Sequence, residues 1–212
     1  MTTRRHFSAI ALTSLAGVPL AAFAQEKPLE GKHYVTLSTR QPTRDVKKVE
    51  VLEFFAYSCS HCHAFEPALD AWQKRLPPDV LFRRIPVAFR DDLVIHQKLY
   101  FAIEALGLVE RLHAKVFLAI HSDRHRLGTA EEIGAFVAKN GVESARFVET
   151  MNSFSVAGKA KQATQLTAGY NIEGTPSLGV DGRWLTSGSL AGSNASSLAV
   201  ADYLVGLAKK SG

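Results

Sequence analysis

The sequence predicts an α/β fold whose two α/β segments are separated by an all-helical insertion. A dense apolar run at residues 49–56 is followed by an amphipathic helical pattern and by a second apolar run at residues 80–87. This order of strand, helix and strand is typical of a βαβ unit. Only helical patterns fill residues 91–169, and strand patterns return at residue 175. We therefore assign the returning strands to the same α/β domain as the first ones.

Residues 1–24 are expected to be a signal peptide. Two arginines at positions 4 and 5 precede a mostly apolar run over residues 9–18, and the tripeptide Ala-Phe-Ala ending at Ala24 fits a signal-peptidase site. The apolar run is shorter than the roughly 20 residues that span a membrane. We predict cleavage after Ala24 and export from the cytoplasm. The paired arginines leave Sec and Tat export both open.

The first α/β segment is predicted to cover residues 25–90. A short strand is expected at residues 33–38, and the apolar run at residues 49–56 has the composition of a buried strand. The helix that follows carries large apolar side chains at i, i+4 and i+7 from Phe65, which gives it one apolar face. Two prolines and an aspartate then end this helix before the next strand.

The second α/β segment is predicted to cover residues 170–212, after a helical domain at residues 91–169. Strands are expected at residues 175–180 and 183–188, joined by an Asp-Gly turn, and an amphipathic helix at residues 193–210. The helical insertion contains no chemical motif of its own.

Composition and charge exclude several classes of protein. The chain carries 25 Lys and Arg against 20 Asp and Glu, and two of the basic residues lie in the signal peptide. The remaining net charge of about +3 is spread along the chain and predicts no nucleic-acid partner. A hydrophobic content of 46% excludes a disordered chain. An exported chain with only two cysteines has no disulfide framework, and their close spacing would stabilise the fold little. We expect their role to be chemical.

The two cysteines lie in the stretch Cys59-Ser60-His61-Cys62-His63, which fits three kinds of site. It could be a redox dithiol, a c-type haem attachment that includes His63, or half of a zinc site. Zinc needs further ligands, and the chain has no second C-x-x-C. The strand that leads directly into the stretch indicates a βα junction and so favours the dithiol, in which case His63 is expected to be an exposed helix residue without a role.

The position of Cys59 predicts that it is the reactive cysteine. Backbone N–H groups and the helix dipole at the first turn of a helix favour a thiolate and lower the pKa. Cys62 lies one turn deeper and would resolve a mixed disulfide, while His61 is a candidate to stabilise the thiolate. Glu53, within an apolar strand, is interpreted as a buried acid whose raised pKa lets it move the proton of Cys62. An ion pair with Arg84 is the alternative, and both can hold.

The stretch VLEFFAYSCSHCHAFEP resembles the active-site segment of the DsbA family of periplasmic thiol:disulfide oxidoreductases. A helical insertion in the same place and EGTPSLGVDGR after it extend the resemblance over most of the chain. The resemblance implies a thioredoxin-like fold with an inserted all-helical domain and a periplasmic location. It also implies that Thr175 and Pro176 form a cis-proline loop that faces the dithiol and binds substrate. Ser60 replaces the proline of the best-known members, so we expect it to tune the redox properties.

The resemblance further implies that Cys59 and Cys62 donate their disulfide to reduced, unfolded exported proteins. A quinone-linked membrane oxidase of the DsbB type would restore the disulfide. We expect no metal, no cofactor beyond the disulfide itself, and a monomer. A disulfide reductase or isomerase of the same fold, and a c-type haem electron carrier, are the alternatives.

Overall fold

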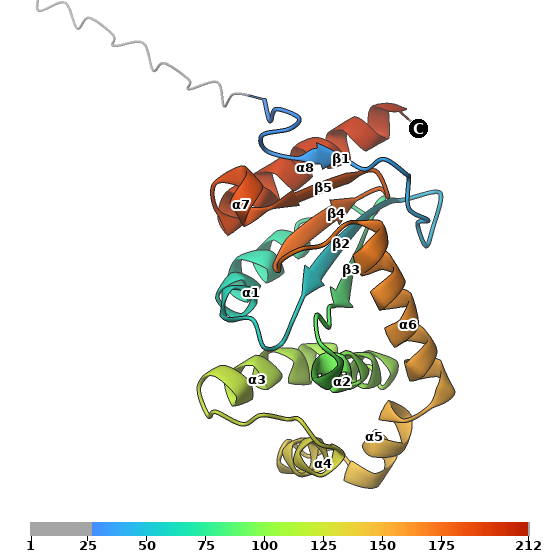
Figure 1. Cartoon of the computed structure of the whole chain (residues 1–212), viewed down its shortest axis with the longest axis vertical. Coiled ribbons are helices and arrows are strands. Elements are labelled where there is room, and N and C mark those ends of the chain that lie inside the picture. Colours follow the sequence, from blue (N-terminus) through green and yellow to red (C-terminus); the bar gives the residue numbers. More distant parts are fainter. Residues whose placement is uncertain (1–26, 212) are drawn as a thin grey trace, which may run out of the picture.

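The computed structural model describes residues 27–211 (Figure 1), so the predicted signal peptide and its cleavage site lie outside the described residues. Within these residues five strands form one mixed sheet in the order β1-β5-β4-β2-β3. The strands are β1 (Val35–Thr36), β2 (Val49–Phe55), β3 (Val80–Pro86), β4 (Ser177–Val180) and β5 (Trp184–Ser187). No helix within residues 27–211 is both long and apolar enough to cross a membrane.

Strand β2 lies in the interior of the sheet, between β4 and β3. It pairs with β3 in parallel and with β4 antiparallel. Helix α1 (Ser60–Gln73) joins β2 to β3, which is the βαβ unit that the sequence predicts. Val51 packs into the core on one face of the sheet, whereas Leu52 and Phe54 pack into the core on the other. Burial on both faces explains why this strand reads as a continuous apolar run.

Residues 91–169 contain only helices, which together form the helical insert. They are η1 (Asp91–Leu93), α2 (Val94–Ala105), α3 (Val109–His121), α4 (Ala130–Lys139), α5 (Ser144–Met151) and α6 (Phe154–Gly169). Figure 1 shows α2 to α5 gathered below the sheet, with α6 running back up to it. Two further helices, α7 (Gly188–Ala191) and α8 (Asn194–Ser211), follow β5. The thioredoxin-like arrangement with a helical insertion is the predicted fold class.

The bounds of β1 and β4 differ from the predicted ones by two residues, whereas those of the other strands agree within one residue. β1 is limited to the two residues that pair with β5 at the edge of the sheet, rather than residues 33–38. β4 begins at Ser177 rather than at Thr175. Pro176 has no N–H to donate to a neighbouring strand, so the ladder starts after it.

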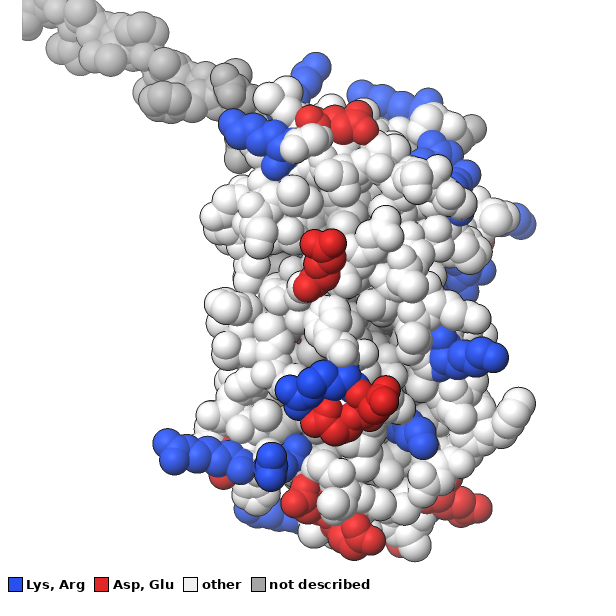
Figure 2. All heavy atoms as spheres, in the orientation of Figure 1, with Lys and Arg blue, Asp and Glu red and all other residues white. Residues whose placement is uncertain are grey.

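Charged side chains of both signs lie on one face of this fold. In Figure 2, Lys and Arg are interspersed with Asp and Glu on the face in view. This distribution agrees with the small net charge of +5 of the whole chain.

Candidate active site

The two cysteines lie where β2 gives way to α1. Cys59 is the N-cap of α1, with an extended backbone (φ −90°, ψ 115°), and its sulfur accepts a hydrogen bond from the backbone N–H of Cys62 at 3.4 Å. The first N–H groups of a helix have no partner inside the helix. The sulfur of Cys59 therefore occupies the position that a capping oxygen usually takes.

The environment separates the two thiols by their pKa values. The hydrogen bond from the Cys62 thiol lowers the pKa of Cys59 to about 5, assisted by the Thr175 side chain and by the backbone N–H groups of Cys62 and His61, although partial burial opposes the shift. The same thiol–thiolate hydrogen bond, together with burial, raises the pKa of Cys62. Cys59 is half-buried and Cys62 is fully buried. The arrangement thus contains one accessible thiolate and one protected thiol.

The loop before β4 faces this pair. The Cys59 thiol lies 3.3 Å from the carbonyl oxygen of Thr175, and the peptide bond between Thr175 and Pro176 is cis. Phe54 of β2 is paired with Ser177 of β4, and the two strands are antiparallel. The beginning of β4 therefore lies beside the end of β2, next to the cysteines. The resemblance implied this placement and this cis bond.

His61 and Ser60 both have exposed side chains at the first turn of α1. His61 lines an open groove of about 990 Å³ together with Thr175 and Pro176, which we call the active-site groove. Its contribution to the low pKa of Cys59 comes from the backbone N–H. Tuning by the His61 side chain and by Ser60 stays a prediction.

Glu53 lies in a buried charge cluster behind the dithiol. It is paired in register with Arg84 on β3, and the Arg84 Nε atom lies 3.2 Å from the Glu53 carboxyl. The Arg84 Nη2 atom also contacts Glu66 at 3.1 Å and Asp70 at 2.9 Å. Burial, followed by repulsion from Glu66, holds the pKa of Glu53 well above its usual range, although Arg84 opposes the shift. Glu53 is thus both a buried acid and a partner of Arg84.

Glu66 and His113 complete this cluster. The His113 Nε2 atom lies 3.3 Å from Glu66, and its Nδ1 atom lies 2.8 Å from the Tyr57 hydroxyl. Burial opposes ionisation of Glu66, but His113 and Arg84 outweigh it and lower the pKa of Glu66. Burial lowers the pKa of His113 despite the nearby carboxylate. Two neighbouring carboxyls with pKa values moved in opposite directions are suited to hold and transfer a proton.

The sequence predictions missed Glu66, His113 and Tyr57. Glu66 is four residues after Cys62, on the buried face of α1. A charged residue within the apolar face of a helix is the sequence signal that could have indicated a buried acid here. His113 likewise lies on the buried face of α3. No local pattern, however, indicates that these two helices bring the side chains together.

The expectation that the His63 side chain is exposed is wrong. Its side chain is half-buried and stacks on Phe117 and His121 of α3, with ring centroids 5.6 and 5.1 Å away. His121 also lies 2.9 Å from the carbonyl oxygen of Tyr57. His63 therefore joins the active-site helix to the helical insert. Cys62, one of the two cysteines that a c-type haem would need, is fully buried.

Known proteins resemble this chain along most of its length. The family model of the DSBA-like thioredoxin domain matches residues 90–199. The thiol:disulfide interchange protein DsbA of Bordetella parapertussis is 40% identical over 201 residues, which cover 92% of this chain and 96% of the relative. The corresponding protein of Burkholderia cepacia is 38% identical over 187 residues, with 88% of each chain covered.

Solved structures agree with these sequence matches. The crystal structure of DsbA from Pseudomonas aeruginosa matches with a TM-score of 0.84 and 36% identity, covering 87% of this chain and 96% of that chain. The structure of the oxidoreductase DsbA from Xylella fastidiosa matches with a TM-score of 0.81 and 30% identity, covering 87% of this chain and 100% of that one.

Proposed function

The chain belongs to the DsbA family of thiol:disulfide oxidoreductases, and we propose that Cys59 and Cys62 are the residues through which it oxidises substrate cysteines. One observation carries the assignment. Cys59 caps α1 with a pKa of about 5, directly above a buried, protonated Cys62. A stabilised thiolate stabilises the reduced form, so the disulfide between these residues readily oxidises other thiols.

The proposed reaction consists of two exchanges. A substrate thiolate attacks the Cys59 sulfur, the bond between Cys59 and Cys62 breaks, and Cys62 leaves with the electron pair and takes up a proton. A second substrate thiolate then attacks the substrate sulfur of the mixed disulfide and releases Cys59 as a thiolate. The substrate loses two electrons and gains a disulfide, while the dithiol gains those two electrons. The low pKa of Cys59 makes it a good leaving group in the second step.

We assign Glu53 as the group that exchanges a proton with Cys62. Its raised pKa favours the protonated carboxyl, and repulsion by its carboxylate form contributes to the raised pKa of Cys62. Protonated Glu53 can supply the proton when Cys62 leaves, and its carboxylate can take the proton back when Cys62 attacks.

We assign substrate binding to Thr175 and Pro176. Thr175 faces Cys59 and precedes the first residue of β4. An extended substrate segment that adds beside this loop would bring its cysteine to Cys59. His61 lines the same groove and Ser60 begins α1, so both are placed to affect the reaction of the Cys59 disulfide.

The family membership also supports the partners and the location that we propose. Reduced, unfolded exported proteins would be the substrates, and a quinone-linked membrane oxidase of the DsbB type would accept the two electrons. The mature protein, cleaved after Ala24, would act in the periplasm as a monomer without a further cofactor.

Incubating the oxidised mature protein with a reduced, unfolded test protein examines this function. We expect stoichiometric loss of substrate thiols with wild type and with Ser58→Ala, and none with Cys59→Ser. Oxidation at the wild-type rate by Cys59→Ser would contradict the assignment of Cys59 as the reactive cysteine. Equilibration with glutathione separates an oxidase from a reductase, because an oxidase is reduced at low glutathione concentration.

A further inference from the structure

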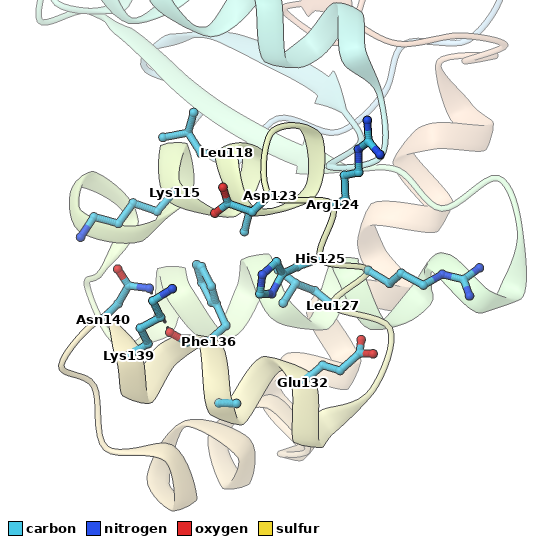
Figure 3. Close-up of a pocket in the computed structure, with 13 residues that line it drawn as sticks. Lys115, Leu118, Asp123, Arg124, His125, Leu127, Glu132, Phe136, Lys139 and Asn140 are labelled. Atoms are coloured by element: carbon cyan, nitrogen blue, oxygen red, sulfur yellow. Dashed lines mark hydrogen bonds between the residues drawn. The ribbon is translucent and has the colours of Figure 1, made fainter.

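A second open site lies on the helical insert, apart from the active-site groove. Residues of α3, of the loop over residues 122–129 and of α4 surround a pocket of about 750 Å³ (Figure 3), which we call the insert pocket. Leu118, Leu127 and Phe136 give it an apolar lining, and the Leu118 side chain is 48% exposed. The dithiol chemistry proposed above makes no use of this pocket.

The insert pocket has an excess of positive charge. Four of its lining residues are cationic: Lys115, Arg124, Arg126 and Lys139. Within residues 27–211 none of the four forms an ion pair. The lining contains two acids, Asp123 and Glu132, and Glu132 accepts a hydrogen bond from the backbone N–H of Gly128. The four cations therefore outnumber the two carboxylates. Unpaired cations around an apolar lining favour a ligand that is both anionic and apolar.

The loop on one side of the pocket has a fixed shape. Arg124 and Leu127 have positive φ angles of 59° and 48°, which non-glycine residues adopt only where their surroundings hold them. Leu127 is buried in the core, the backbone N–H of His125 donates to the end of α3 at 2.8 Å, and the carbonyl oxygen of Arg126 lies 3.1 Å from a buried histidine of α2. Figure 3 shows His125 and Phe136 between the α3 and α4 ribbons. A preformed site loses little entropy when it binds a ligand.

The insert pocket begins close to the dithiol. His121, the last residue of α3, stacks on His63, which follows Cys62 in the chain. The pocket lining includes Ala119 and Asp123, which lie two residues before and two residues after His121. A polypeptide whose cysteine reacts at Cys59 can therefore continue across this histidine pair onto the insert.

We propose that the insert pocket binds acidic stretches, with a large apolar side chain among the carboxylates, in the unfolded proteins that react at Cys59. The apolar side chain covers Leu118, and the carboxylates face the lysines and arginines. This inference rests on the proposed function, because it names the substrates that the dithiol oxidises fastest.

Direct binding tests the pocket without the redox reaction. The probe is a fluorescent, cysteine-free peptide that alternates glutamate with phenylalanine, and a lysine–phenylalanine peptide is its counterpart. We expect the mature protein to bind only the glutamate peptide, less tightly at higher salt. The double variant Lys115→Glu/Lys139→Glu should bind it about fivefold more weakly, and the control Lys161→Glu on α6 should bind it like wild type. Equal binding of both peptides, or no effect of the double variant, would overturn the proposal.

Oxidation rates then link the pocket to the dithiol. Two reduced peptides carry the same pair of cysteines, one flanked by glutamate and phenylalanine and the other by lysine and phenylalanine. Wild type and Lys161→Glu should oxidise the acidic peptide faster, and Lys115→Glu/Lys139→Glu should lose or reverse this preference. Oxidation without preference refutes the pocket and leaves the dithiol function intact. Binding of the cysteine-free peptide without oxidation of either substrate refutes the dithiol function instead, and with it the role of the pocket in substrate choice.

Discussion

The sulfur of Cys59 lies 3.3 Å from the carbonyl oxygen of Thr175, although 116 residues separate them in the sequence. Antiparallel pairing of β2 with β4 creates this contact. Only a protonated Cys59 can donate to a carbonyl, so ionisation exchanges this bond for those from the Cys62 thiol, the Thr175 side chain and the first backbone N–H groups of α1. The site thus offers hydrogen-bond partners to both protonation states of Cys59.

Reduced protein should become more stable as pH rises, because the pKa of Cys59 falls from 9.0 to about 5 on folding. Ionisation of Cys59 therefore favours the folded state. Its contribution is complete above the pKa of the unfolded chain and disappears as pH falls through about 5. The difference in free energy of unfolding between reduced wild type and Cys59→Ala, from denaturant titrations, should shrink from pH 8 to pH 5. A difference that does not change over this range would contradict the lowered pKa.

Glu53→Gln should slow substrate oxidation by about tenfold or more, because an amide cannot exchange a proton with Cys62. The Cys59 thiolate should titrate nearly as in wild type, since its main hydrogen-bond donors remain. Stopped-flow rates and a thiolate titration on the same sample separate the two effects. An unchanged oxidation rate would remove Glu53 from the reaction and leave it as the partner of Arg84.

His113→Gln should lower the free energy of unfolding by about 1–3 kcal/mol, because the buried Tyr57 hydroxyl loses its hydrogen-bond partner and the buried Glu66 carboxyl loses the nearby imidazole. His125→Gln is the control, since this histidine is exposed and the change should stay within about 0.5 kcal/mol. Urea unfolding at one pH compares the two variants. Equal stabilities would mean that His113 does not hold the cluster together.

Two glycine substitutions should change stability in opposite directions. A Cβ atom at Gly179 would lie 2.3 Å from the buried ring of Tyr170, so Gly179→Ala should cost about 1–3 kcal/mol. Gly158 lies within α6 and has nothing within 4 Å of its would-be Cβ atom, so Gly158→Ala should stabilise by about 0.5–1 kcal/mol. Thermal or urea unfolding measures both. Destabilisation by both changes to the same extent would contradict the packing described for β4.

Local patterns were sufficient to predict the framework of the site. The apolar strand before Cys59 and the helical period after it placed the cysteines at a βα junction, and the adjacent strands made Arg84 a natural partner for Glu53. Glu66 and His113 escaped prediction because their contact depends on how α3 docks against α1. His63 was misjudged for the same reason, since Phe117 and His121 cover it from the helical insert. Contacts between helices that are distant in the sequence leave no periodic signal in either helix.

Titration of the Cys59 thiolate by ultraviolet absorbance tests the redox assignment most directly. The reduced protein should show one midpoint at about 5, and Cys62→Ala should raise it, because the Cys62 thiol is the main donor to Cys59. Oxidised protein should show no such transition. A midpoint near the value of a free cysteine, about 8.5, would contradict a stabilised thiolate and the oxidising disulfide that follows from it.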